Sequence, residues 1–109
     1  LVRRHATVLI TGGTGVGKTT LLKALLAQCD VNERIVTVEE VRELGELGRG
    51  DHVSLVTREA NVEGVGAISL TDLVKATLRM RPDAWCWANA VARKSSTYCA
   101  RSILVITVA

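Results

Sequence analysis

The residues best suited to chemistry lie near the start of the chain, where Gly12, Gly17, Lys18 and Thr19 follow the spacing Gly-x-x-x-x-Gly-Lys-Thr. Glycines at this spacing let the backbone turn tightly and bring successive N–H groups close to a phosphate. The lysine then lies against the outer phosphates, and the threonine hydroxyl binds a Mg²⁺ that bridges them. The pattern predicts a phosphate-binding loop, or P-loop.

The segments on either side of this loop match the context that a P-loop requires. An apolar, β-branched run at residues 7–11 predicts a strand, and a leucine-rich stripe predicts a helix from about Gly17 to Gln28. The helix would point its N-terminal N–H groups and positive dipole end at the bound anion. The alternative is a glycine-rich turn with a solvated lysine, and the flanks favour the binding loop. The expected nucleotide contacts are Gly12, Gly13, Thr14, Gly15, Val16, Gly17, Lys18, Thr19 and Thr20, with Thr19 as the metal ligand.

Three acidic residues follow the second predicted strand, which covers residues 34–38. Glu39, Glu40 and Glu43 stand directly after this strand, and ligands of open parallel sheets gather at the carboxyl ends of strands. We expect these carboxylates to face the phosphates, where they polarise a water molecule or hold Mg²⁺ through water. The alternative is a solvated acidic helix start.

Up to about residue 83, the sequence continues to alternate between predicted strands, loops and helices. Residues 52–57 predict a strand, and residues 44–50 and 61–66 predict glycine-containing loops. A helix is expected to begin at Thr71 and Asp72, to run close to Met80 and to stop before Pro82. Arg58, Arg79 and Arg81 are candidate phosphate or subunit contacts. The alternation predicts an α/β fold, a parallel sheet with flanking helices.

The composition restricts the class of protein. With 109 residues, 48% hydrophobic and 23% charged, the chain fits at most one globular domain. A net charge of +3 is too small to argue for nucleic acid, and no membrane-length apolar run or signal-peptide pattern occurs. Three cysteines without metal-site spacing indicate a reduced, cytoplasmic chain. A first residue other than Met suggests the interior of a longer protein.

Several motifs together resemble one family. They are Thr11 to Leu22, Glu33 to Glu40, Thr57 and Arg58, Asn61 to Gly64, Asp72 to Lys75, and Leu78 to Asp83. From residue 7 to 83 the chain resembles the ATPase core of the type II/type IV secretion superfamily. It is most similar to the pilus-assembly ATPases of the tight-adherence (CpaF-type) systems.

The resemblance implies a P-loop NTPase (RecA-like) core that binds ATP and Mg²⁺. It implies Lys18 and Thr19 as the Walker A pair, and Glu39, Glu40 and Glu43 as a catalytic acidic box in which Glu40 replaces the usual aspartate. It makes Arg58, Arg79 and Arg81 better candidates for nucleotide or intersubunit contacts. Members of the family are cytoplasmic, usually hexameric, and act at inner-membrane pilus or secretion machines. No direct nucleic-acid partner is expected.

The pattern breaks after Asp83. The family continues with an apolar strand ending in Gly-Glu-x-Arg-Gly, whose glutamate activates the attacking water. This chain instead reads Ala84-Trp85-Cys86-Trp87-Ala88-Asn89, and residues 84–109 contain no acidic residue. We therefore expect a partial ATPase domain at residues 1–83 and an aberrant tail at residues 84–109.

The genetic code offers a reason for the break. Reading possible codons from the third base of the Ala84 codon forces Val-Leu-Gly and permits Glu-Cys-Arg-Gly-Ala-Glu-Val-Val-Asp after it. This string resembles the missing continuation of the family. Our hypothesis is that residues 84–109 are a frame-shifted tail, and the encoding DNA tests it because bases that cannot spell Gly-Glu in the second frame exclude it.

The tail has consequences for activity and for folding. Without a glutamate to orient water, we expect weak nucleotide binding and negligible hydrolysis. Residues 103–108 can fill a strand position or act as an aggregation-prone segment. Two alternatives stay open: a non-catalytic nucleotide-binding or subunit-interaction module, and a different P-loop enzyme such as a small kinase, for which no acceptor-site or lid sequence is visible.

Overall fold

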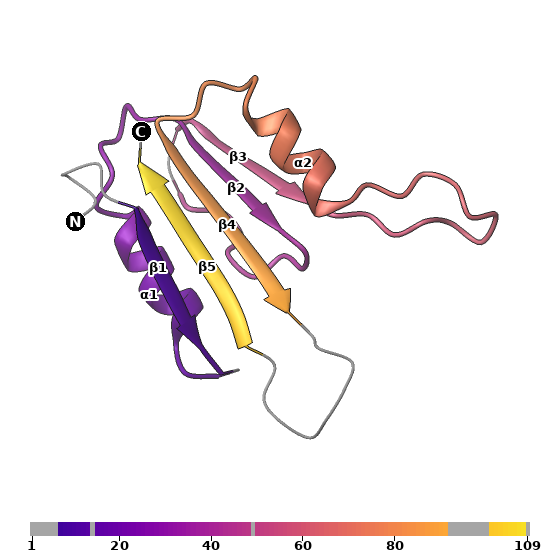
Figure 1. The fold of residues 1–109 in the computed structure, drawn as a ribbon. Coiled ribbons are helices and arrows are strands. Elements are labelled where there is room, and N and C mark those ends of the chain that lie inside the picture. Colours follow the sequence, from indigo (N-terminus) through magenta and orange to yellow (C-terminus); the bar gives the residue numbers. More distant parts are fainter. Residues whose placement is uncertain (1–6, 14, 49, 92–100, 109) are drawn as a thin grey trace.

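A computed structural model describes residues 7–13, 15–48, 50–91 and 101–108. They form one five-stranded sheet with a helix packed on each face (Figure 1). In chain order the elements are β1 (Val8–Gly12), α1 (Lys18–Leu26), β2 (Ile35–Glu39), β3 (His52–Val56), α2 (Leu70–Thr77), β4 (Ala84–Val91) and β5 (Arg101–Val108). The predicted α/β class is confirmed, and the predicted strands and helices are found within a few residues of their expected positions.

The sheet has the strand order β1-β5-β4-β2-β3. The strand β2 pairs in parallel with β3 on one side and with β4 on the other, so three strands form the predicted partial parallel sheet. The strand β5 departs from a purely parallel sheet because it is antiparallel to both β4 and β1. Only residues 92–100 join β4 to β5, and a parallel crossover needs about a dozen residues or more. The short connection therefore explains the reversed direction.

The core lies between the sheet and α1. Leu22 and Leu26 of α1 are fully buried against Ile35 and Cys86 from two central strands, and Leu44 from the loop after β2 closes this cluster. Each leucine of this kind contributes about 1.5–3 kcal/mol of hydrophobic free energy when fully buried. Every residue of β2 is buried, as expected for a parallel strand covered on both faces.

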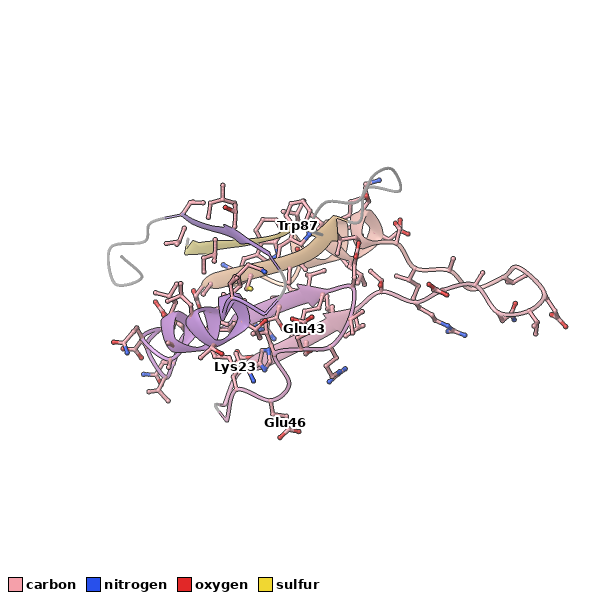
Figure 2. All side chains as sticks on the ribbon, turned by 90° about the horizontal axis from the view of Figure 1, so that it is seen from below. Lys23, Glu43, Glu46 and Trp87 are labelled. Atoms are coloured by element: carbon pink, nitrogen blue, oxygen red, sulfur yellow. The ribbon has the colours of Figure 1, made fainter. Side chains whose placement is uncertain are left out.

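The opposite face of the sheet is covered only in part. The helix α2 packs against β2 and β3, whereas Trp87 of β4 lies on the side away from α1 (Figure 2). Trp85 lies on the same face, because side chains alternate along a strand and Ala84 and Cys86 face α1. The two indole rings lie 6.3 Å apart, and their Nε1 atoms are buried with no hydrogen-bond partner among the described residues. Leu9 of β1 is 61% exposed.

The helix α2 begins with a capping box and ends earlier than the sequence predicts. Ser69 accepts a hydrogen bond from the Asp72 backbone N–H, and the Asp72 side chain accepts one from the Ser69 N–H. The last helical residue is Thr77, well before Pro82. The residue before a proline is kept out of the helical region, and Arg81 has a left-handed φ of 51°. Arg79 and Arg81 therefore lie beyond the helix and do not complete its last turn.

Residues 58–68 form a protruding arm that replaces the expected flexible connection. Its base is closed by two backbone hydrogen bonds between Arg58 and Ile68. Near its tip the Asn61 side-chain oxygen accepts hydrogen bonds from the N–H groups of Glu63 and Val65, both at 3.0 Å. Figure 1 shows that the arm extends away from the sheet. The arm is thus ordered by its own backbone and by Asn61.

Candidate functional site

The predicted P-loop joins β1 to α1, as the sequence indicates. The strand ends at Gly12 and the helix begins at Lys18. Gly17 is the N-cap of α1 and has a left-handed φ of 87°, a conformation that strains any residue with a side chain. Thr14, one of the predicted contacts, lies outside the described residues. The loop therefore leads directly into the N-terminus of α1, where the backbone N–H groups of the first turn are close together.

Among Gly12, Gly15 and Gly17, only Gly12 lies close to a neighbouring side chain. A Cβ atom on Gly12 would lie 3.0 Å from Cγ2 of Val16. The Lys18 side chain runs past Gly12, and its Nζ donates a hydrogen bond to the carbonyl of Gly13. The ammonium group consequently lies inside the loop. A glycine-rich loop with a lysine ammonium beside its backbone suits the charge of a phosphate group.

The next residue, Thr19, reaches one of the predicted acids. Its Oγ1 donates a hydrogen bond to Oε2 of Glu43 at 2.9 Å. Glu43 belongs to the loop that follows β2 (Figure 2). A hydroxyl and a carboxylate from segments far apart in the sequence thus meet at the start of α1. Such oxygen atoms are the ligands that Mg²⁺ prefers.

Glu39 is the last residue of β2, and its side chain is 1% exposed. Its Oε1 accepts hydrogen bonds from the backbone N–H groups of Glu43 at 3.2 Å and Leu44 at 3.0 Å. Its Oε2 is buried and has no partner among the described residues. The alternative of a solvated helix start does not apply, because residues 40–48 form no helix and Glu39 is buried. Glu39 therefore positions the loop that carries Glu43.

Glu40 is arranged differently from the other two acids. Its carbonyl accepts a hydrogen bond from Oγ1 of Thr57 at 3.2 Å, and its carboxylate has no hydrogen bond or ion pair within the described part of the chain. Thr57 also donates its backbone N–H to the Glu39 carbonyl at 3.0 Å. Sequence reasoning assigned no role to Thr57. The sequence signal that could have identified Thr57 is its position at the end of the strand predicted at residues 52–57. In the structure this strand is β3, which pairs in parallel with the strand that ends at Glu39.

The three candidate arginines do not join this group. Arg58 lies at the base of the arm, with its guanidinium against Gly66, where a Cβ atom would be 3.6 Å from Cζ. Arg79 and Arg81 precede β4 and are exposed. The strands β1, β2 and β4 run in the same direction, so residues that precede β4 lie at the opposite edge of the sheet from the P-loop.

Two cysteines and one histidine lie in the described part of the chain. Burial, together with the nearby Glu39 carboxylate, raises the pKa of Cys86 to about 12, so its thiol stays protonated at neutral pH. Cys29 and Cys86 are buried, and Nε2 of His52 lies 3.0 Å from Oγ1 of Thr37. His5 and Cys99 lie outside the described residues. Within the described ranges, no group of three or more His, Cys, Asp or Glu side chains is placed to hold a metal.

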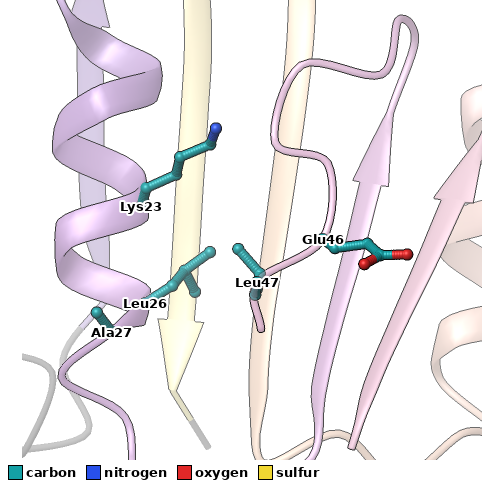
Figure 3. A pocket seen from close by; sticks show the side chains of 5 residues that line it. All are labelled: Lys23, Leu26, Ala27, Glu46 and Leu47. Atoms are coloured by element: carbon teal, nitrogen blue, oxygen red, sulfur yellow. The ribbon is translucent and has the colours of Figure 1, made fainter. Parts of the chain in front are cut away.

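A small hollow lies apart from these residues. It lies between α1 and the loop after β2, has a volume of about 140 Å³, and is lined by Lys23, Leu26, Ala27, Glu46 and Leu47 (Figure 3). Lys23 is one helical turn beyond Thr19, and none of the predicted site residues lines the hollow. We therefore place the candidate site at the P-loop and not in this hollow.

Comparison with known proteins decides the family. The profile of the type II/IV secretion system protein family matches residues 1–85 of this chain. The chain belongs to this family. The matched region contains every predicted site residue, together with β1, β2, β3 and both helices, and it ends at the second residue of β4. Membership of the tight-adherence branch stays a prediction.

Curated relatives agree with this assignment. A conjugal transfer protein of Mycobacterium tuberculosis is 50% identical over 84 residues, which are 76% of this chain and 23% of the relative. The type IV secretion system protein PtlH of Bordetella pertussis is 42% identical over 81 residues, which are 74% and 24% of the two chains. The protein VirB11 of Agrobacterium tumefaciens is 43% identical over 77 residues, which are 71% and 22%.

The secretion-family chain therefore spans less than a quarter of the length of these relatives, from 22% to 24%. The similarity stops before β5 and before most of β4. Among the described helices, none is both long and apolar enough to span a bilayer.

Proposed function

We propose that this chain is an ATP-binding fragment of a secretion or pilus-assembly motor ATPase. The observation that carries the proposal is the hydrogen bond between Thr19 and Glu43 beside Lys18, at the N-terminus of a helix entered through a glycine loop. This arrangement supplies a cation, backbone N–H groups and metal-seeking oxygens at one place. Each is a requirement for holding a triphosphate with its metal.

Individual residues have distinct roles in this proposal. Backbone N–H groups of Gly13, Gly15 and Gly17 would hold the phosphates, and the Lys18 ammonium, which now donates to the Gly13 carbonyl, would supply the positive charge beside them. Thr19 and Glu43 would supply the oxygen atoms that hold the metal when it is bound. Mg²⁺, when bound, neutralises charge on the outer phosphates. Glu39 keeps the Glu43 loop in place through two backbone hydrogen bonds.

The fragment should hydrolyse ATP very slowly. In the register of the sheet Glu39 pairs with Ala88, so Asn89 is the next residue along β4 at the same edge as the P-loop. The second reading frame permits a glutamate at this place, five residues after Ala84. The present chain has no acid there, and it therefore lacks a group on β4 to orient the attacking water.

Calorimetry tests nucleotide binding. Folded chain should bind ATP in the presence of Mg²⁺, and Lys18→Ala should remove this binding because the internal cation is lost. Lys23→Ala is the matched control, since it removes an exposed lysine from the same helix and should leave the affinity unchanged. Folded protein without Mg²⁺-dependent affinity, or equal affinity for the Lys18→Ala variant, contradicts the proposal.

The proposal extends to the cellular setting. As part of a motor of this family the polypeptide would work in the cytoplasm, in homo-hexamers docked on inner-membrane pilus or secretion proteins.

A sensitive phosphate-release assay tests the expected loss of ATP hydrolysis. Turnover comparable to that of intact relatives, if it is abolished by Lys18→Ala, contradicts this expectation.

A second candidate is a non-catalytic nucleotide-binding or interaction module. The described tail favours it, because β4 and β5 complete the sheet between β1 and β2 instead of leaving it open. A stable fold with nucleotide binding and no turnover, together with a defined protein partner, would distinguish this module from an unused remnant.

A further inference from the structure

Two exposed surfaces at opposite edges of the sheet have complementary chemistry. The first is the arm tip, which consists of Val62, Glu63 and Val65. The second is the basic end of α2, which consists of Lys75, Leu78, Arg79 and Arg81. We propose that the arm tip of one copy of this chain binds the basic end of α2 on the next copy. The proposal deepens the self-assembly proposed above and does not depend on nucleotide binding.

The strand directions show that the two surfaces cannot meet within one molecule. The arm follows β3 at the carboxyl edge of the parallel strands, whereas the basic end precedes β4 at their amino edge. Figure 1 shows the arm pointing away from the sheet and the end of α2 lying on the far side from the arm tip. Contact between the two surfaces therefore requires two copies.

Three charged side chains of the two surfaces, Glu63, Arg79 and Arg81, have no partner among the described residues. Among the described residues the only ion pair joins Arg34 to Asp51. The carboxylate of Glu63 and the guanidinium groups of Arg79 and Arg81 make no hydrogen bond or ion pair within those ranges. These opposite charges are thus available for a contact between copies, and such complementarity fixes orientation and partner.

Apolar side chains accompany the charges on both surfaces. Val62 at the tip is 108% exposed and Leu78 at the basic end is 73% exposed. The arm holds Val62 in this position through the two hydrogen bonds to Asn61 and the paired base, so little conformational entropy is lost when it binds. An ordered arm with an exposed valine at its tip is suited to contact another surface.

Backbone strain at Arg81 supports the same conclusion. Arg81 is the only residue other than glycine with a positive φ among the described residues, and such conformations persist where the surrounding structure imposes them. The flanking contacts do impose it: the Arg34 guanidinium donates to the Met80 carbonyl at 2.7 Å, and Asp83 accepts from the Arg34 N–H at 2.8 Å. Arg81 is exposed, as is Arg79.

A contact between two different surfaces is heterologous. Each copy then offers one free tip and one free basic end, so association continues until a ring closes or a filament forms. Sedimentation velocity of the chain over a range of concentrations, without nucleotide, should show reversible association that weakens as salt is added.

Charge reversal tests the surfaces directly. Glu63→Lys should weaken association by roughly tenfold or more, because the tip then repels the basic end, and Arg79→Glu should do the same from the other side. A mixture of these two variants should associate again, since each supplies the surface that complements the other. Glu46→Lys changes the net charge by the same amount on an exposed loop and should leave association unchanged.

Several results would overturn the proposal. These are a chain that stays monomeric at low salt, association that is equally strong in Glu63→Lys, an equal loss in the Glu46→Lys control, and a mixture of the two variants that fails to associate. All substituted side chains are exposed, and circular dichroism of each variant checks that folding is retained. A chain that binds nucleotide and remains monomeric would refute this contact and leave the proposed nucleotide binding intact.

Discussion

At the scale of single residues, Glu39 combines two properties that rarely occur together. Its carboxylate is buried at the end of the central strand, and only one of its oxygens is hydrogen-bonded among the described residues. Burying a carboxylate is costly unless it is paired, so a structural role alone would be satisfied by a neutral acceptor. The unpartnered Oε2 is the atom that we expect to take part in metal or water binding.

Substitution of Glu39 separates these two roles. Glu39→Gln keeps an acceptor for the N–H groups of Glu43 and Leu44, so the melting temperature should change little while Mg²⁺-dependent ATP affinity falls. Glu39→Ala leaves both N–H groups unpaired and should cost on the order of 1–3 kcal/mol of unfolding free energy or more. Thermal melts and calorimetry measure the two effects. Equal nucleotide affinity in Glu39→Gln would leave Glu39 with a structural role only.

Cys86 provides a second prediction for a single residue. Burial and the adjacent Glu39 raise its pKa to about 12, and the thiolate is the reactive form. We expect no labelling of Cys86 by a thiol reagent at neutral pH in the folded chain, and complete labelling in denaturant. Peptide mass spectrometry identifies the labelled residue. Fast labelling of Cys86 under native conditions would show that β4 is not packed as described.

At the scale of elements, the N-terminus of α2 links stability to pH. The Ser69 hydroxyl is the main cause that holds the pKa of Asp72 below its ordinary value, and the Ser69 backbone N–H adds to it. A carboxyl group whose pKa is lower in the folded state stabilises folding above the unfolded-state pKa. This contribution disappears as the pH falls through the folded-state pKa.

Ser69→Ala should therefore change both the pKa of Asp72 and the pH dependence of stability. The pKa of Asp72 should rise toward its ordinary value, because the hydroxyl hydrogen bond is lost while the backbone hydrogen bond remains. The melting temperature should fall near neutral pH and approach that of the parent chain in acid, where Asp72 is protonated in both. Carboxyl NMR titration gives the pKa. An unchanged pKa would contradict the capping box.

The elements also show what local sequence patterns can and cannot predict. Strand positions and the P-loop were predictable because apolar runs and glycine spacing act locally. The early end of α2 was missed, because apolar residues recur at helical spacing as far as Met80, whereas the helix ends at Thr77. The sequence predicted that Thr19 and Glu43 lie near one another, because both follow the carboxyl ends of strands at the same edge of the sheet. It did not predict the hydrogen bond between them.

At the scale of the whole molecule, β5 connects the P-loop strand to the rest of the sheet. The sequence predicted that residues 103–108 can form a strand, and the structure confirms a strand there. Its place between β1 and β4 and its antiparallel direction were not predictable, because they follow from pairing with segments at both ends of the chain. Whether the tail arose by a frame shift is a question for the encoding DNA.

Truncation tests this arrangement. A chain that ends before Arg101 removes the strand neighbour of β1, so we expect lost cooperativity in thermal unfolding and weaker nucleotide binding. Fluorescence of Trp85 and Trp87 should shift to longer wavelength as the face of β4 becomes hydrated. Circular dichroism follows the melt. A truncated chain that melts as sharply as the parent would show that β5 contributes little.

Asn89→Glu tests the missing catalytic group. The register places this position beside the end of β2, where Glu39 lies, so a carboxylate there should increase ATP turnover from a very low level without a large change in nucleotide affinity. Asn89→Gln is the control of equal length. Equal turnover in both variants would mean that other features of the lost continuation are required.

The position of β5 has one more consequence. Removal of the edge strand β3 would leave the other strands joined to one another, but removal of β5 would divide the sheet into a single strand and a three-stranded piece. The region shared with the secretion-family relatives ends at residue 85. The residues that match the family thus contain the glycine loop with Lys18 and Thr19, while the continuity of the sheet depends on β5, which lies outside the matched residues.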